Sequence, residues 1–238
     1  MTSPARRIRM SKTTVAVASA LIVYALLWIG YVQNWSWLTA VDDVWLRALH
    51  DFGATRPGWV SLWVVVSAIL APRVCQVIGF IGIVVSVYRR DYSTALYLLV
   101  SVELMAFVLV CAKWLVQRPR PSTAFVSDAS TSFPSGHAFG VTVGILTFIT
   151  VLWPTIRERW RILLACTGVA LILLVGFARV ALNVHHPSDV LAGWSLGVAY
   201  YLVIASGFSR TSLLRSQSPA ERRSTRPRRA ERSRPAVR

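Results

Sequence analysis

Long apolar runs, separated by short segments that hold most of the polar residues, dominate this sequence. A helix needs about 20 predominantly apolar residues to cross the hydrocarbon core of a membrane. The pattern therefore predicts an all-α protein in which residues 14–208 form a bundle of six transmembrane helices. The expected spans are residues 14–31, 73–88, 94–115, 137–153, 162–180 and 188–206.

Two further segments are expected at the membrane surface. Residues 41–51 mix apolar side chains with Asp42, Asp43, Arg47 and Asp51, which is typical of an interfacial helix. Apolar character resumes at residue 59, but Pro72 interrupts it. We therefore predict that residues 59–70 form a short helix that lies at the interface or dips into it, and that the second span follows Pro72.

The first apolar run follows four basic residues, a combination that also occurs in signal peptides. The run is long enough to span a membrane, and Trp28, Trp35 and Trp37 stand where an aromatic belt would form. No small-residue cleavage site is evident. We expect a retained first helix, preceded by a basic cytoplasmic N-terminus of residues 1–13.

Composition supports a membrane protein, because 55% of the 238 residues are hydrophobic and only 15% are charged. The net charge of +16 suggests a nucleic-acid partner, but ten of the 26 basic residues are arginines of the segment 210–238. No basic patch is interleaved with aromatic residues, which argues against nucleic acid. Residues 209–238 are predicted to be a disordered cytoplasmic tail, which either binds anionic lipid or only anchors the topology.

The distribution of basic residues also predicts the orientation in the plasma membrane. With six spans, 19 of the 26 basic residues lie in the two termini and in the turns near residues 89–90 and 157–161, which share one side. The other side holds the remaining seven. Because short cytoplasmic segments are enriched in Lys and Arg, both termini are expected in the cytoplasm.

Three polar segments are expected to emerge together at the extracytoplasmic end. Residues 113–121 follow the third span, residues 134–137 open the fourth, and residues 179–189 join the fifth to the sixth. They contain the cations Lys113, Arg120 and Arg179. Arginine binds phosphate oxygens in bidentate fashion, so three cations at one face predict a phosphate site.

The same segments contain residues suited to phosphoryl transfer. Ser135 and Gly136 precede a predicted helix, whose first N–H groups and dipole favour an anion. His137 and His185 can divide the roles of nucleophile and acid. Asp189 comes four residues after His185, within reach of it if the helix starts early, and would fix its tautomer. No cluster with metal-ligand spacing accompanies them, so neither a metal nor another cofactor is expected.

The three segments resemble the signature of the PAP2 superfamily, the type-2 phosphatidic acid phosphatases: K-x6-RP, then PSGH, then SR-x5-H-x3-D. Every position matches except Ala178, which stands where the signature has a serine before Arg179. The motifs cover residues 113–189. The resemblance implies a bacterial membrane lipid phosphatase with six spans, and the missing serine hydroxyl affects the expected substrate detail rather than the reaction.

The resemblance also implies roles for single residues. His185 would attack phosphorus and form a phosphohistidine, Asp189 would orient it, and His137 would protonate the leaving lipid oxygen and then activate water. These steps need no metal. The phosphate ligands implied by the resemblance are Lys113, Arg120, Ser135, Gly136 and Arg179.

The expected reaction is hydrolysis of a lipid phosphomonoester or diphosphate at the extracytoplasmic face. The family implies undecaprenyl-type polyprenyl diphosphate, phosphatidylglycerophosphate or phosphatidate as substrate, and an outward site favours the polyprenyl carrier. Two alternatives stay open. One is a phosphotransferase that uses an acceptor other than water; the other is a channel or transporter for anions, against which the His–Asp pair and the lack of an inverted repeat argue.

Several neighbouring residues have two interpretations. His186 adjoins His185, but only His185 has the distances of the signature. Arg118 contacts either the phosphate or the headgroup region. Asp128 is interpreted as a solvated loop carboxylate, with contact to a polar headgroup as the alternative. Glu103, in mid-span, is expected to make a neutral interhelical hydrogen bond, with a role in substrate access as the alternative.

Glycines repeat every four residues in the fourth and sixth predicted spans. Small residues at this spacing allow helix backbones to approach closely in lipid. The repeats predict either packing within the chain, which would draw His137 and His185 together, or the seam of a homodimer. They are Gly136, Gly140, Gly144, Gly193 and Gly197.

Overall fold

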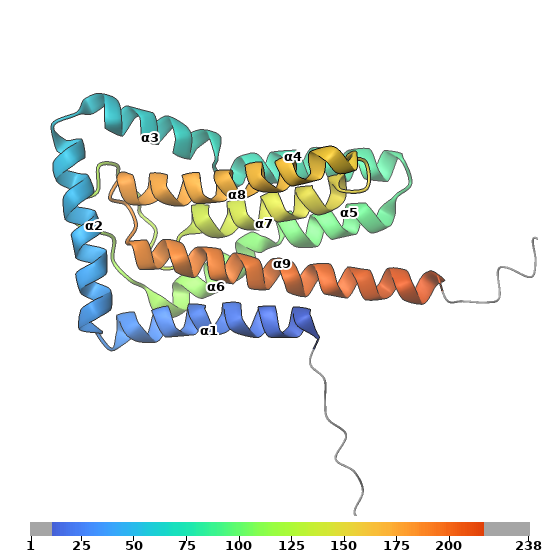
Figure 1. The fold of residues 1–238 in the computed structure, drawn as a ribbon, viewed down its shortest axis with the longest axis horizontal. Coiled ribbons are helices and arrows are strands. Elements are labelled where there is room, and N and C mark those ends of the chain that lie inside the picture. Colours follow the sequence, from blue (N-terminus) through green and yellow to red (C-terminus); the bar gives the residue numbers. More distant parts are fainter. Residues whose placement is uncertain (1–10, 217–238) are drawn as a thin grey trace, which may run out of the picture.

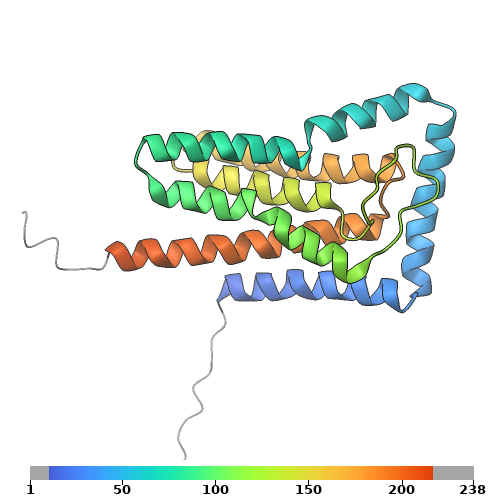
Figure 2. The same ribbon diagram turned by 180° about the vertical axis from the view of Figure 1, so that it is seen from behind.

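The computed structural model describes residues 11–216, and every regular element in that part of the chain is a helix. The helices run lengthwise as a bundle, except for α2, which lies across one end (Figure 1). The start of α1 and the end of α9 both lie away from α2 (Figure 2). The elements are α1 (Lys12–Val32), α2 (Ser36–Ala54), α3 (Pro57–Ile69), α4 (Pro72–Tyr88), α5 (Tyr92–Leu98), the π-helical turn η1 (Leu99–Glu103), α6 (Met105–Val116), α7 (Gly136–Leu152), α8 (Glu158–Ala181) and α9 (Pro187–Ser216).

Six apolar stretches of the described chain account for the expected spans. Five are long and apolar enough to cross a membrane, and the shorter apolar helix α7 is the sixth. α7 lies in the middle of the bundle, in contact with α4, α8 and α9. The protein is therefore a multi-pass, all-helical membrane protein, as predicted. The five longer stretches are α1, α3 with α4, α5 through α6, α8, and α9 as far as Phe208.

Residues 59–70 are placed differently from the prediction. α3 runs lengthwise beside α8 rather than along the surface (Figure 1) and buries Trp63 and Ser67 there. Pro72 interrupts the helix because proline lacks an N–H group and favours an extended residue before it, as seen at Ala71. α3 and α4 together form one interrupted span of residues 57–88.

α2 is the expected interfacial helix, but it is longer than residues 41–51. It crosses the end of the bundle at which the three polar segments emerge (Figures 1 and 2). Its inner face carries Leu38, Asp42 and Leu46, which are spaced four residues apart and are all buried. One acidic side chain therefore points inward between two leucines.

The third span contains an irregular turn, η1, between α5 and α6. The hydroxyl of Tyr200 in α9 donates a hydrogen bond to the carbonyl of Val100 in this turn. Glu103 ends the turn and faces Gly79 of α4, where an added Cβ would lie 3.1 Å from Oε1. Oε1 is buried without a hydrogen-bond partner. The interhelical hydrogen bond expected for Glu103 is not formed by this oxygen, because the residue opposite is a glycine.

The glycine repeats pack helices of this chain against one another. A Cβ on Gly140 would meet Pro72 at 2.7 Å, and a Cβ on Gly193 of α9 would meet the carbonyl oxygen of Ser135 at 2.7 Å. A backbone oxygen cannot move aside as a flexible side chain can, so only glycine allows α9 to approach the start of α7 this closely. These contacts support packing within the chain; a homo-oligomer formed through another surface stays a prediction.

The C-terminal tail begins later than predicted. Residues 209–216 continue α9, whereas disorder was expected from residue 209. Extension of an existing helix is favourable, and the next proline is Pro219. Residues 1–10 and 217–238 lie outside the described part of the chain, so the predictions for the basic N-terminus and for the rest of the tail stay predictions.

Candidate active site

Three segments that are distant in sequence meet beneath α2. They are the loop of residues 117–135, the first turn of α7, and the turn of residues 182–186 between α8 and α9. Backbone hydrogen bonds join them: Phe125 N–H donates to the carbonyl of Leu182 at 3.0 Å, and Ser135 N–H to the carbonyl of Asp189 at 2.9 Å. The structure thus brings the three motif segments to one end of the bundle.

The imidazole of His185 is buried in the turn between α8 and α9, with 1% of its side chain exposed. Its Nε2 lies 3.2 Å from Nη1 of Arg120. Because arginine can only donate, this contact assigns a lone pair to Nε2 and the ring proton to Nδ1. Nδ1 lies 3.4 Å from Oγ of Ser132 and 3.7 Å from Oδ2 of Asp189. The unprotonated nitrogen therefore lies beside a guanidinium group, which can also bind a phosphate oxygen.

Asp189 is fully buried in the first turn of α9, and several donors share its carboxylate. Arg118 Nη1 donates to Oδ1 at 2.7 Å, while the Ser132 hydroxyl and His186 Nδ1 contact Oδ2, the latter at 3.0 Å. The distance of 3.7 Å to His185 is longer than a hydrogen bond. The predicted pairing of Asp189 with His185 is therefore bridged by the hydroxyl of Ser132.

His186 has different surroundings from His185. Its Nδ1 and its backbone N–H both contact Oδ2 of Asp189, at 3.0 and 2.9 Å. Its ring lines two cavities beside α2, with volumes of 210 and 350 Å³. The nitrogen that contacts the Arg120 guanidinium belongs to His185, which agrees with the assignment based on the distances in the signature.

Arg120 is held in place by the loop and by the turn. Its Nη1 donates to the carbonyl of Val184 at 2.7 Å, and its Nε donates to the carbonyl of Ser130 at 2.8 Å. Its Nη2 donates to Oδ2 of Asp128 at 2.6 Å. These contacts fix the plane of the guanidinium beside His185. Asp128 is thus an ion-pair partner of the site rather than a solvated loop carboxylate.

Arg179 projects from the last turn of α8, and only 6% of its side chain is exposed. Its Nη1 donates to Oγ of Ser67 at 2.7 Å, and its Nη2 lies 3.9 Å from Oδ2 of Asp128. Its Nε is buried without a partner in the structure, so one donor remains for a ligand. The preceding Ala178 is buried in an apolar cluster with Trp63.

The remaining predicted residues surround the start of α7. Ser135 caps this helix, since its Oγ accepts a hydrogen bond from the helix backbone at 3.5 Å. Gly136 and His137 are the first two residues of α7, where backbone N–H groups have no acceptor within the helix. Lys113 Nζ donates to the carbonyl of Thr131, and Cε would lie 4.0 Å from a Cβ on Gly136. All the predicted site residues therefore lie at this end of the bundle.

A buried ion network behind the site was not predicted. Arg118 donates from Nη2 to Oδ2 of Asp42 at 2.9 Å and from Nη1 to Oγ of Ser188 at 2.7 Å. The carboxylate of Asp42 also accepts the backbone N–H of Ser188 at 2.9 Å. Arg118 therefore holds Asp189, a contact that neither interpretation of this residue, phosphate or headgroup, included. The sequence signal for Asp42 was its position four residues from leucines on both sides of an amphipathic helix.

The loop and the turn combine a neutral imidazole with an ionised carboxylate. Burial lowers the pKa of His185 to about 4, although Asp189 opposes this shift. Burial by itself would raise the pKa of Asp128, but hydrogen bonds from Ser130 and the charges of two arginines lower it below its ordinary value. At neutral pH the imidazole of His185 is therefore uncharged and the carboxylate of Asp128 is charged.

The arrangement suits transfer of a phosphoryl group. A buried imidazole lone pair, cationic side chains and the N-terminus of α7 surround one region, in which the cations would neutralise developing charge. Within residues 11–216, no three His, Cys, Asp or Glu side chains form a group that could hold a metal ion.

Comparison with known proteins identifies relatives of this chain. The family model of the PAP2 superfamily matches residues 94–212. Phosphatidylglycerophosphatase B of Bacillus subtilis is 34% identical over 131 residues, which make up 53% of this chain and 64% of that protein. An undecaprenyl-diphosphatase of Sulfolobus acidocaldarius is 29% identical over 118 residues, 47% of this chain and 53% of that protein. The chain thus spans less than two thirds of the length of either relative.

The fold has a solved counterpart. The crystal structure of a transmembrane PAP2-type phosphatidylglycerolphosphate phosphatase from Bacillus subtilis superposes with a TM-score of 0.67 and 25% identity, covering 85% of this chain and 98% of that chain. The likeness therefore extends well beyond the three motif segments. The family match itself includes every predicted site residue and half of the chain. The chain belongs to the PAP2 superfamily.

Proposed function

We propose that this protein is an integral membrane lipid phosphatase that hydrolyses a phosphomonoester or a diphosphate through a phosphohistidine intermediate. The observation that carries the proposal is the buried, neutral imidazole of His185. Its Nε2 lone pair lies 3.2 Å from Nη1 of Arg120, and its Nδ1 is turned toward Ser132 and Asp189. Arg120 can bind a phosphate beside Nε2, and the contacts of Nδ1 hold the ring in the tautomer that leaves Nε2 unprotonated for attack on phosphorus.

The reaction would proceed in two steps. First, Nε2 of His185 attacks phosphorus, the bond to the leaving oxygen breaks, and His137 gives that oxygen a proton. Then His137 takes a proton from water, the water oxygen attacks phosphorus, the phosphorus–nitrogen bond breaks, and inorganic phosphate leaves. Throughout, Lys113, Arg120, Arg179 and the first amides of α7 neutralise charge on the phosphoryl oxygens.

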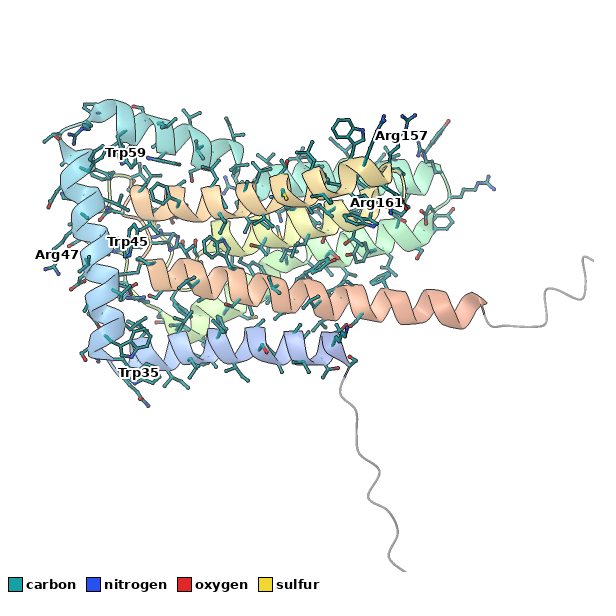
Figure 3. The ribbon with its side chains drawn as sticks, viewed as in Figure 1. Trp35, Trp45, Arg47, Trp59, Arg157 and Arg161 are labelled. Carbon is teal, nitrogen blue, oxygen red and sulfur yellow. The ribbon has the colours of Figure 1, made fainter. Side chains whose placement is uncertain are left out.

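The site would face the extracytoplasmic side of the plasma membrane. Figure 3 places Trp45 and Arg47 on α2 at the site end, and Arg157 and Arg161 at the opposite end. The prevalence of Lys and Arg in short cytoplasmic segments supports this orientation. The relatives are named for phosphatidylglycerophosphate and undecaprenyl diphosphate. An undecaprenyl-type diphosphate is the preferred substrate, with phosphatidylglycerophosphate and phosphatidate as the other candidates.

Phosphate release by the purified full-length protein, measured separately on these three lipids and without an added acceptor, tests the proposal. Wild type should release phosphate, and His185→Ala should not, while keeping its thermal stability. Turnover that requires an added alcohol would favour a phosphotransferase. No turnover on any lipid, together with intact anion binding, would favour an anion channel or transporter.

A further inference from the structure

The carboxylate of Asp128 contacts the two arginines of the proposed phosphate site. Oδ2 of Asp128 lies 2.6 Å from Nη2 of Arg120 and 3.9 Å from Nη2 of Arg179. One oxygen atom thus faces both guanidinium groups that would hold the substrate phosphate. Arginine binds carboxylate and phosphate oxygens through the same N–H donors, so Asp128 stands in the place of a ligand.

Asp128 is held by its own loop rather than by packing. Its Oδ1 accepts hydrogen bonds from the backbone N–H and the hydroxyl of Ser130, both at 2.9 Å. The Asp128 side chain is 34% exposed, whereas those of Arg120 and Arg179 are 11% and 6% exposed. The carboxylate therefore lies at the mouth of the site, above the buried cations. It can turn toward solvent without any change in the helix core.

A phosphate and this carboxylate exclude each other. If a phosphate bound to Arg120 and Arg179 while Asp128 stayed in place, like charges would lie side by side in a half-buried site, which is unfavourable. The affinity measured for any phosphate therefore includes the free energy of displacing Asp128. This applies equally to the lipid substrate and to inorganic phosphate, the product.

We propose that Asp128 is an internal competitor that the substrate phosphate must displace and that promotes release of the phosphate product. It lowers the affinity of the site for every phosphate by the same factor. A lipid substrate is also held by its chain in the membrane and still binds, whereas inorganic phosphate has only its charge and dissociates. The inference rests on the proposed function, since it takes Arg120 and Arg179 as phosphate ligands.

Binding of inorganic phosphate to the purified full-length protein, measured by calorimetry, tests this inference. Asp128→Asn keeps the size of the side chain and removes its charge, so it should lower the Kd for phosphate about tenfold. The inhibition constant of phosphate as a product should fall by the same factor.

Two matched variants serve as controls. Asp128→Glu keeps the charge and should leave the Kd for phosphate close to the wild-type value. Asp43→Asn removes an equal charge from an exposed position of α2 at the same end of the bundle. At physiological salt, screening should keep its effect on the Kd below about twofold.

The possible outcomes separate this inference from the proposed function. A Kd for phosphate in Asp128→Asn that equals or exceeds the wild-type value overturns the inference, because Asp128 would then position the arginines instead of competing with phosphate. If wild type still hydrolyses lipid phosphates in that case, only this inference fails. If neither protein binds phosphate and wild type hydrolyses no lipid phosphate, the proposed function fails as well.

Discussion

Arg179 in α8 donates a hydrogen bond of 2.7 Å from Nη1 to the hydroxyl of Ser67 in α3. Ser67 is 4% exposed and Arg179 is 5% exposed, so the contact is made out of reach of bulk water. A residue of the interrupted second span therefore positions a proposed phosphate ligand. The neighbouring Ala178 has no hydroxyl that could do so.

We expect Ser67→Ala to reduce kcat/KM about tenfold, because a hydrogen bond to a charged guanidinium is lost and its donor is left buried. Ser61→Ala, at an exposed position of the same helix, is the matched control and should have no effect. Restoring the serine of the signature by adding Ala178→Ser to Ser67→Ala should recover part of the loss. Equal kcat/KM values for Ser67→Ala and wild type would show that the hydrogen bond from Arg179 to Ser67 does not contribute to activity.

His185→Ala is expected to abolish phosphate release while the protein stays folded and inserted. His186→Ala should retain measurable turnover, because that imidazole lacks the contact with Arg120 and only helps to hold Asp189. The measurement is kcat for both variants, with thermal unfolding as the check on folding. The opposite order of activities would assign the nucleophile to His186.

The pH dependence of kcat/KM should reflect the burial of His185. Its pKa is lowered to about 4, compared with about 6.5 for an exposed histidine, so the nucleophile stays neutral as pH falls below 6. After correction for ionisation of the substrate phosphate, kcat/KM should fall only as pH approaches 4. The free energy of unfolding should decrease earlier, as pH falls from about 6.5 to about 4, because over this range the unfolded chain binds a proton that the buried ring does not. A fall in corrected kcat/KM centred near pH 6.5 would contradict this assignment.

Activity should survive excess chelator. The proposed charge neutralisation comes from Lys113, Arg120 and Arg179 and from the start of α7, none of which EDTA removes. Phosphate release measured before and after EDTA treatment should agree within error. Loss of activity that added magnesium restores would refute the metal-free mechanism.

Cysteine labelling tests the orientation. In a variant without Cys75, Cys111 and Cys166, Ser122→Cys places an exposed thiol in the loop beneath α2, and Glu158→Cys places one at the start of α8, at the opposite end. A membrane-impermeant thiol reagent should modify the first in intact cells and the second only after lysis. The reverse pattern would place the site in the cytoplasm and favour an intermediate of inner-leaflet phospholipid synthesis as substrate.

The convergence of the site could be predicted from sequence because apolar spans behave as rods of known length. Lys113 and His137 are separated by no span and His137 and His185 by two, so an even number of spans places all three at the same end. The side-chain geometry within that end could not be predicted. The hydroxyls of Ser132 and Ser67 reach the site from segments whose sequence carries no sign of it.

The prediction for α3 was wrong for a physical reason. Pro72 was interpreted as the boundary between a surface helix and a span, whereas a proline can also interrupt one continuous membrane crossing. The position of Trp63 and Ser67, one helical turn apart on the same face, indicates burial against a neighbour. Hydropathy alone does not identify that neighbour as α8.

The contact between Asp42 and Ser188 has a consequence for biosynthesis. These residues are 146 positions apart, so α2 leaves the ribosome long before the last membrane segment exists. Until α9 is inserted, Asp42 and Arg118 can contact each other but lack their contacts with Ser188 and Asp189, and the turn that carries His185 is not anchored. A nascent chain that has inserted only its earlier spans would therefore lack the proposed site, and hydrolysis would begin only after α9 has been inserted.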